Sequence, residues 1–186
     1  MKKILSLFSL LFLLGVANEA FCRSLSGDAA NVERPGPSNR RSPFVISEIM
    51  YHPAPQESGA NLEFIEIFNS QPWWEEVGSF HIDGDINYSL PPGTRIEKLN
   101  YLVIASDPEA VKKAYGMENV LGPYTGRLSN GGGRLRLRNN LDAVLFEVDY
   151  DTRAPWPSSA DGAGHSLTLG RPSYGEQDMR AWLQSN

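Results

Sequence analysis

The sequence predicts an all-β domain that folds as a β-sandwich and contains one short helix. Eight short segments are rich in β-branched and aromatic residues, and turn-forming residues separate them. The 186-residue chain also spreads 13 prolines and 17 glycines along its length, which favours many short elements over a few long ones. An open β-barrel is the competing architecture.

The first 22 residues have the pattern of a secretory signal peptide. Lys2 and Lys3 precede an apolar run at residues 4–17, which is too short to cross a hydrocarbon layer about 30 Å thick. Small residues place the cleavage after Ala17 or after Cys22, and lipid attachment at Cys22 is a rival interpretation. Cys22 is the only cysteine, so no internal disulfide can form. We expect the mature protein to be secreted, periplasmic or at the cell surface, with no transmembrane segment.

Residues 23–43 are expected to form a disordered linker. Serine, glycine, proline, asparagine and arginine dominate this stretch, and Leu25 and Val32 are its only large aliphatic residues. Such a composition buries too little apolar surface to offset the entropy lost on ordering. The folded domain is therefore expected to cover residues 44–186.

The net charge argues against one class of function. Removing Lys2, Lys3 and Glu19 from the 17 basic and 22 acidic residues leaves the mature chain with a net charge of −6. The linker holds four arginines against two acidic residues, so the segment expected to fold has a net charge of −8. An acidic domain does not coat nucleic acid with its whole surface, although a local basic face remains possible.

The first two strands are expected at residues 44–51 and 62–69. The first ends at Pro53 and Pro55, because proline cannot continue a hydrogen-bonded ladder. The second has apolar residues on both of its faces, which indicates a central strand that is covered on both sides for part of its length.

The remaining strands follow at short intervals. Glycine, proline and asparagine clusters mark the turns between them. The expected strands are residues 77–83, 86–90, 101–105, 134–139, 143–150 and 165–170. Between the third and fourth of these, a serine or aspartate cap precedes Pro108, and Gly116 provides a stop, so the one helix is expected there.

Six motifs follow one another along the chain. They read VISEIMYHP, NLEFIEIFNS, LPPGTRIEKLNYLVIASDP, LSNGGGRLRLRN, VDYD with PWP, and DGAGHSLTL. On these motifs, over roughly residues 44–182, the chain resembles the bacterial, secreted branch of the lamin tail domain family. The resemblance implies an immunoglobulin-like β-sandwich that binds other macromolecules, proteins or DNA, and carries out no reaction.

Two departures from the family pattern lead to further expectations. Phe80 lies where relatives often have a glycine-tryptophan pair, so it is expected to fill the aromatic position in the core. Relatives also usually continue well past the position of Trp182. The resemblance therefore implies a shortened gene product whose last edge strand is incomplete.

An alternating pattern of arginine and leucine gives a candidate anion-binding face on the strand at residues 134–139. Alternation along a strand places its arginines on one face, and a further arginine extends the stripe. The residues are Arg127, Arg134, Arg136 and Arg138. The ligand would be nucleic acid, acidic polysaccharide or a phospholipid headgroup. The simpler interpretation is that the arginines pair with Glu147 and Asp149 on the neighbouring strand. No aromatic residues alternate with the arginines, which argues against single-stranded nucleic acid as the ligand.

Two adjacent tryptophans give a candidate contact site. Trp73 and Trp74 follow Pro72 in an expected loop, where two large aromatic side chains are difficult to bury together. Exposed tryptophan favours contact with protein or carbohydrate. The alternative is packing beneath a long loop. Trp156, between two prolines, is expected to close one end of the sandwich.

No group of residues has the spacing of a catalytic or metal site. The three histidines are far apart, and the glycine run at residues 131–133 lacks the lysine and helix of a phosphate loop. Glu63 and Glu66 are expected on opposite faces of their strand, so they cannot act as a carboxylate pair. The acidic turns could hold calcium but match no EF-hand. We expect no catalytic residue, no metal and no cofactor.

The sequence therefore predicts a secreted, non-catalytic interaction or tethering module, and no enzyme. Its partner is expected to be a protein or another surface macromolecule, with nucleic acid as a weaker candidate. The alternative is an accessory domain of an extracellular hydrolase or kinase-like protein whose catalytic part is missing from this chain. The ligand and the oligomeric state are left open.

Overall fold

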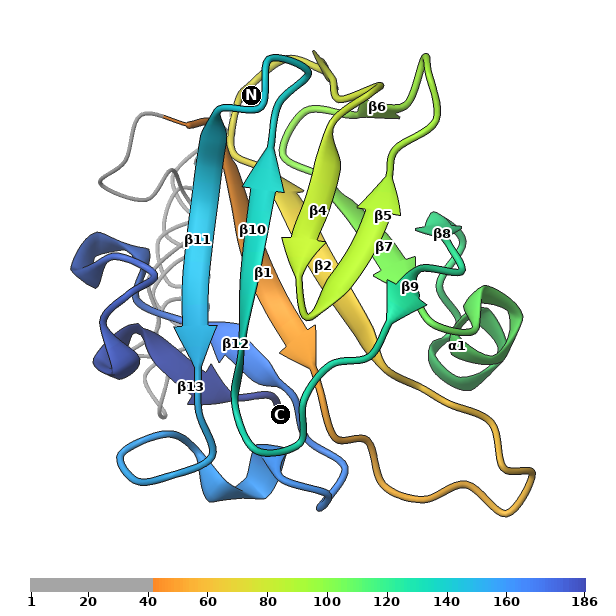
Figure 1. Cartoon of the computed structure of the whole chain (residues 1–186), viewed down its shortest axis with the longest axis vertical. Helices are drawn as coiled ribbons and strands as arrows, with labels where there is room; N and C mark the ends of the chain where they lie inside the picture. The colour runs from red at the N-terminus through yellow and green to blue at the C-terminus, as the bar shows by residue number, and fades with distance from the viewer. Residues whose placement is uncertain (1–41) are drawn as a thin grey trace, which may run out of the picture. The chain divides into compact units, whose positions relative to one another are not determined.

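The computed structural model describes residues 42–186. The signal peptide expected at residues 1–22, and all but the last two residues of the expected linker, lie outside this part. The described residues form a β-sandwich of a six-stranded and a five-stranded sheet, with a separate two-stranded ribbon (Figure 1). The all-β sandwich with one short α-helix is confirmed, and so are the eight strands expected from the sequence.

The six-stranded sheet has the order β13-β12-β1-β2-β7-β8. Its strands are β1 (Phe44–Met50), β2 (Phe64–Asn69), β7 (Tyr101–Ala105), β8 (Val120–Leu121), β12 (Leu167–Leu169) and β13 (Trp182–Gln184). β7 and β8 pair in parallel, and the other four neighbouring pairs are antiparallel. The pairing of β1 with β2 shifts between Ile46 and Glu48, so that Ser47 forms a β-bulge.

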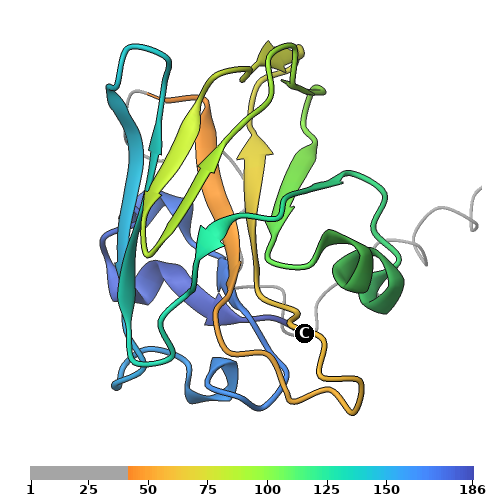
Figure 2. The ribbon, with the colours of Figure 1, turned by 45° about the vertical axis from the view of Figure 1, so that its right-hand side comes forward.

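The five-stranded sheet has the order β11-β10-β4-β5-β9. Its strands are β4 (His81–Gly84), β5 (Ile86–Ser89), β9 (Thr125–Gly126), β10 (Gly133–Arg138) and β11 (Val144–Tyr150). The ribbon consists of β3 (Glu75–Glu76) and β6 (Arg95–Ile96). Figure 2 shows the two sheets as separate layers.

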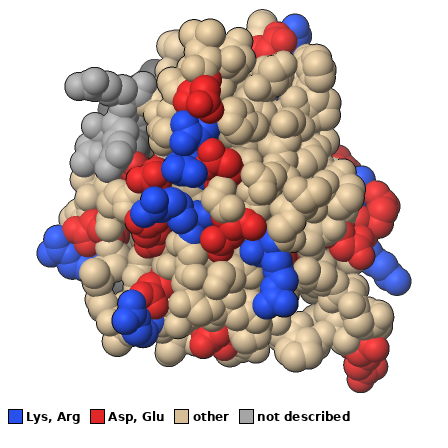
Figure 3. All heavy atoms as spheres, viewed as in Figure 1, with Lys and Arg blue, Asp and Glu red and all other residues tan. Residues whose placement is uncertain are grey.

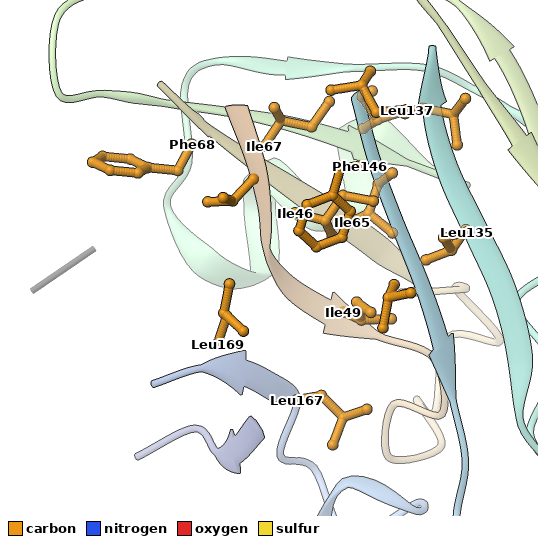
Figure 4. Packing of buried hydrophobic residues seen from close by; sticks show 14 of the residues in the cluster. Ile46, Ile49, Ile65, Ile67, Phe68, Leu135, Leu137, Phe146, Leu167 and Leu169 are labelled. Carbon is orange, nitrogen blue, oxygen red and sulfur yellow. The ribbon is translucent and has the colours of Figure 1, made fainter. Parts of the chain in front are cut away.

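The main core lies between the two sheets. Ile46 and Ile65 from the six-stranded sheet lie together with Leu135 and Phe146 from the five-stranded sheet, and all four are at most 1% exposed (Figure 4). Complete burial of a side chain of this size stabilises the fold by roughly 2 kcal/mol. Phe80 is only half-buried; its ring packs edge-to-face against Phe44 at 5.8 Å.

A second apolar cluster lies on the outer face of the six-stranded sheet, against helix α1 (Pro108–Tyr115). It joins Met50, Phe64 and Val103 to Val111 of the helix. The predicted start and stop of α1 are confirmed, because Asp107 caps the N-terminus and Gly116 ends the helix with a φ of 67°. β2 is thus covered on both faces over the part of its length that includes Phe64, as its apolar residues indicate.

Trp156 belongs to the main core, while its role in closing one end of the sandwich stays a prediction. Its side chain is buried, and its ring centroid lies 6.1 Å from that of Trp182 on β13. No helix among residues 42–186 is both long and apolar enough to span a membrane.

Candidate functional site

The outer face of the five-stranded sheet carries the arginines of the predicted anion-binding face. Arg134 binds Asp149 of β11 through two bonds, Nε to Oδ1 at 2.5 Å and Nη2 to Oδ2 at 2.9 Å. Arg136 and Arg138 share Asp83 of β4, with Nε to Oδ distances of 2.5 and 2.6 Å. Basic and acidic atoms therefore lie intermixed on this face (Figure 3).

The shared carboxylate of Asp83 is the electrostatic centre of this face. Burial acts to raise the pKa of Asp83, but the hydrogen bonds and charges of Arg136 and Arg138 outweigh it and hold the pKa below its ordinary value. Both guanidinium groups are consequently balanced by a charged partner within the sheet. The simpler interpretation made the right assignment for Arg134, whereas Arg136 pairs with Asp83 and not with Glu147.

Arg127 lies apart from the β10 arginines in the chain and follows β9. Its backbone N–H donates to the carbonyl of Asp85 at 3.2 Å, and its exposed side chain forms no ion pair with any residue in 42–186. The structure thus brings Arg134, Arg136 and Arg138 together on one strand. Binding of an anion by these residues stays a prediction.

Trp73 and Trp74 lie on the loop that follows β2. Their side chains are 56% and 49% exposed, so the exposure expected from the sequence is confirmed, while a contact with a partner stays a prediction. Leu99, which is 58% exposed, lies beside this loop because its N–H donates to the carbonyl of Gln71 at 3.1 Å. We call Trp73, Trp74 and Leu99 the tryptophan patch.

Asn69, the last residue of β2, fixes the backbone beneath the tryptophan patch. Its side chain is fully buried, and its Nδ2 donates to the carbonyls of Trp73 at 2.9 Å, Ile96 at 3.1 Å and Glu97 at 3.2 Å. Its Oδ1 accepts from the N–H of Gln71 at 3.0 Å. One side chain therefore ties the loop after β2 to the segment that follows β6.

The side chains of the tryptophan patch are also held by neighbours on the ribbon. The Nε1 of Trp73 donates to Glu75 at 2.8 Å, and the guanidinium carbon of Arg95 lies 4.3 Å from the ring centroid of Trp74. Arg95 also faces Glu76 at 3.8 Å. The patch thus presents aromatic surface on a backbone that is already ordered, bordered by one basic and two acidic side chains.

Each of the three histidines has a different partner. His52 Nδ1 lies 2.6 Å from Asp161, His81 Nε2 lies 3.3 Å from Asp142, and His165 Nδ1 lies 2.9 Å from the carbonyl of Ser185. Each ring therefore joins two segments of the chain.

The acidic turns are occupied by internal hydrogen bonds. Asp85 accepts from the N–H of Ser129 at 3.0 Å, the N–H of Arg134 at 3.1 Å and the hydroxyl of Tyr150 at 2.8 Å. Asp151 pairs with Arg153, whose hydrogen bonds to the carboxylate lower the pKa of Asp151. Across residues 42–186, no three histidine, cysteine, aspartate or glutamate side chains are grouped so that they could hold a metal ion.

Glu63 and Glu66 lie on opposite faces, as expected. Glu63 is buried and accepts from the hydroxyl of Tyr124 at 3.1 Å and the N–H of Leu128 at 3.2 Å, toward the main core. Glu66 points to the outer face, where Ser47 donates to it at 2.7 Å. Its neighbour there is Glu48, which sequence reasoning did not connect with it.

Comparison of the sequence with protein-family models gives no match, and comparison with curated proteins gives none either.

Proposed function

We propose that this chain is a secreted, non-catalytic interaction or tethering module of the lamin-tail type. It binds a protein or another surface macromolecule through the tryptophan patch. The ordered sequence motifs support the type of module, and the pattern of the first 22 residues supports secretion. The observation that carries the choice of surface is the exposure of Trp73 and Trp74 on a loop held by the buried Asn69.

The tryptophan patch is suited to binding because its backbone is already ordered before a partner arrives. Tryptophan is among the residues that contribute most energy at protein interfaces, because it covers a large apolar area with few rotatable bonds. A loop whose backbone is hydrogen-bonded in place loses little further entropy when it binds. Trp74 keeps half of its surface open although Arg95 stacks on it.

The arginine face is the weaker candidate for an anion-binding surface. The three arginines on β10 are paired with Asp83 and Asp149 on the adjacent strands. An anion would have to compete with carboxylates that already satisfy Arg134, Arg136 and Arg138 at 2.5–2.6 Å. Breaking such pairs costs energy that the anion must restore.

The proposal can be tested by capture from an envelope extract of the source cell. The bait is compared with a Trp73→Ser/Trp74→Ser variant, an Arg134→Ser/Arg136→Ser/Arg138→Ser variant, and a Leu141→Ser control. Leu141 is 83% exposed on a different turn, between β10 and β11, so its change matches the loss of apolar surface elsewhere.

We expect the tryptophan variant to lose a bound partner at least tenfold, while the arginine variant and the control retain it. Loss in the arginine variant alone would assign binding to the sheet face. Equal capture by all four proteins would overturn the assignment to either surface.

A further inference from the structure

A hollow of about 290 Å³ lies on the outer face of the six-stranded sheet. Its lining residues with polar side chains are Ser47 and Glu48 on β1, Glu66 on β2, Tyr101 on β7 and Thr168 on β12. Val45 and Leu169 contribute apolar walls. None of these residues belongs to the tryptophan patch, and the following inference does not rest on the function proposed for that patch.

The β-bulge at Ser47 brings the two glutamates together. Ile46 pairs with Ile67 in the main core, and strict alternation from Ile46 would turn Glu48 toward the core as well. The extra residue shifts the alternation, so that Glu48 lies directly opposite Glu66 on the outer face. On its other side Glu48 is the register partner of Thr168, which makes a row of three oxygen-bearing side chains across β12, β1 and β2.

Each carboxyl group is held by one hydroxyl group and faces no cation in the described part of the chain. Ser47 donates to Glu66 at 2.7 Å, and Ser166 donates to Glu48. Neither glutamate forms an ion pair with a lysine, arginine or histidine in residues 42–186. The Oγ1 of Thr168 is buried and has no hydrogen-bond partner there, so the third member of the row is unsatisfied.

The electrostatics of the hollow favour a positive ligand. Burial raises the pKa of Glu48, and burial together with the charge of Glu48 raises the pKa of Glu66 to about 7. The other titratable groups that interact with this pair are Tyr101 on β7 and Tyr115 on α1, whose pKa values burial and the glutamates also raise. A cation between the carboxylates would relieve both the desolvation and the mutual repulsion.

We propose that this hollow binds the side chain of a lysine from a polypeptide partner, with its ammonium group between Glu48, Glu66 and Thr168. An ammonium group has three N–H donors around one point, and the row offers three acceptors. The aliphatic stem lies against Val45 and Leu169, in the manner of long cationic side chains that bury their methylenes. A guanidinium group is a planar fork that suits one carboxylate in a bidentate arrangement, and is the poorer match.

The test is an NMR or calorimetric titration of the purified protein at pH 8. The probes are the Nα-acetyl, N-methylamide derivatives of lysine, arginine and norleucine, with n-butylamine as a free amine. We expect the lysine derivative to bind at least tenfold more tightly than the norleucine and arginine derivatives, and more tightly than n-butylamine. Its binding should weaken at pH 5.5, where the carboxyl groups take up protons.

Glu66→Gln keeps the shape of the side chain and removes its charge, and this variant should lose at least tenfold in affinity for the lysine derivative. Glu147→Gln, on the outer face of the other sheet, is the matched control and should bind normally. Equal affinity for norleucine, or unchanged binding in Glu66→Gln, would overturn the proposal. Preference for arginine would overturn the ammonium assignment, and preference for n-butylamine would overturn the polypeptide source.

Discussion

The side-chain amide of Asn69 donates a hydrogen bond to the backbone carbonyl of Trp73 across 2.9 Å, from a position with no solvent exposure. The exposed aromatic surface is therefore tied directly to the last residue of a central strand. The same amide group also reaches the carbonyls of Ile96 and Glu97. The order of the backbone in the tryptophan patch therefore depends on the six-stranded sheet.

Replacement of Asn69 with alanine should loosen the tryptophan patch before it unfolds the domain. The carbonyls of Trp73 and Ile96 would lose their donor, which costs about 1–3 kcal/mol in the free energy of unfolding. Hydrogen exchange should speed up in residues 70–76 and 95–100, and urea unfolding should report the loss. Asn87→Ala, at an exposed position on β5, is the control and should change neither measurement. Unchanged exchange in the two loops would contradict the role of Asn69.

Replacement of Asp83 with asparagine should destabilise the domain and uncover positive charge. Arg136 and Arg138 would lose their shared carboxylate, at a cost of about 1–3 kcal/mol. Because the pKa of Asp83 is lowered, its stabilisation is present above the ordinary value of 3.8 and is lost as the pH falls through the lowered value. The parent and the variant should therefore converge in acid, as followed by thermal unfolding.

The Asp83→Asn variant should be retained more strongly on heparin at low salt than the parent protein, because Arg136 and Arg138 lose their carboxylate partner. Asp149→Asn removes an equal charge from an exposed pair and should cost less than about 1 kcal/mol. Equal losses of stability in Asp83→Asn and Asp149→Asn would contradict the role of Asp83 as the electrostatic centre of this face.

Replacement of Glu66 with glutamine should flatten the dependence of stability on pH. The pKa of Glu66 rises from an ordinary 4.5 to about 7 in the folded protein. Protonated Glu66 therefore gives its full stabilisation of the fold below pH 4.5. That stability is lost progressively as the pH rises from 4.5 through about 7, by a total on the order of 3 kcal/mol. The variant should gain stability relative to the parent over this interval and keep it at higher pH. Urea unfolding from pH 4 to 8.5 measures the effect, and parallel curves would contradict it.

Alanine substitution in the glycine run should lower stability strongly at Gly133 and hardly at all at Gly131. A Cβ atom at Gly133 would lie 1.8 Å from Oδ2 of Asp85, whereas one at Gly131 meets nothing closer than 4.0 Å. Gly133→Ala must displace a carboxylate that accepts three hydrogen bonds, and should cost about 2–4 kcal/mol. Gly131→Ala should stay within about 0.5 kcal/mol. Thermal unfolding of the pair decides whether close approach to Asp85 is why Gly133 is a glycine.

Periodicity and turn residues were sufficient to predict helix α1 and eight strands, which are β1, β2, β4, β5, β7, β10, β11 and β12. They were insufficient for β3, β6, β8 and β9, because a strand of two residues has no period to detect. The three-residue strand β13, which follows directly on the helical turn Met179–Ala181, was missed as well. The local sequence pattern therefore predicted most strands of the two sheets and left the shortest strands unassigned.

The candidate sites depended on register, which the sequence pattern does not contain. Alternation predicted that Arg134, Arg136 and Arg138 share a face, but the alignment of β4 with β10 decides that Asp83 lies between two of them. In the same way, one bulged residue decides that Glu48 meets Glu66. Asn69 carried a weak signal, since asparagine favours strand ends and turns, but nothing local indicates which carbonyls it reaches.

The pairing of β1 with β12 also has a consequence for how the chain folds. Glu48 and Thr168 are neighbours in the sheet although most of the domain's sequence lies between them. The ribosome delivers β1 long before β12, so one edge of β1 stays without its partner strand during synthesis. Sheets closed by such distant pairs form slowly, on timescales of milliseconds to seconds. The described domain thus completes its larger sheet only after β12 and β13 have emerged.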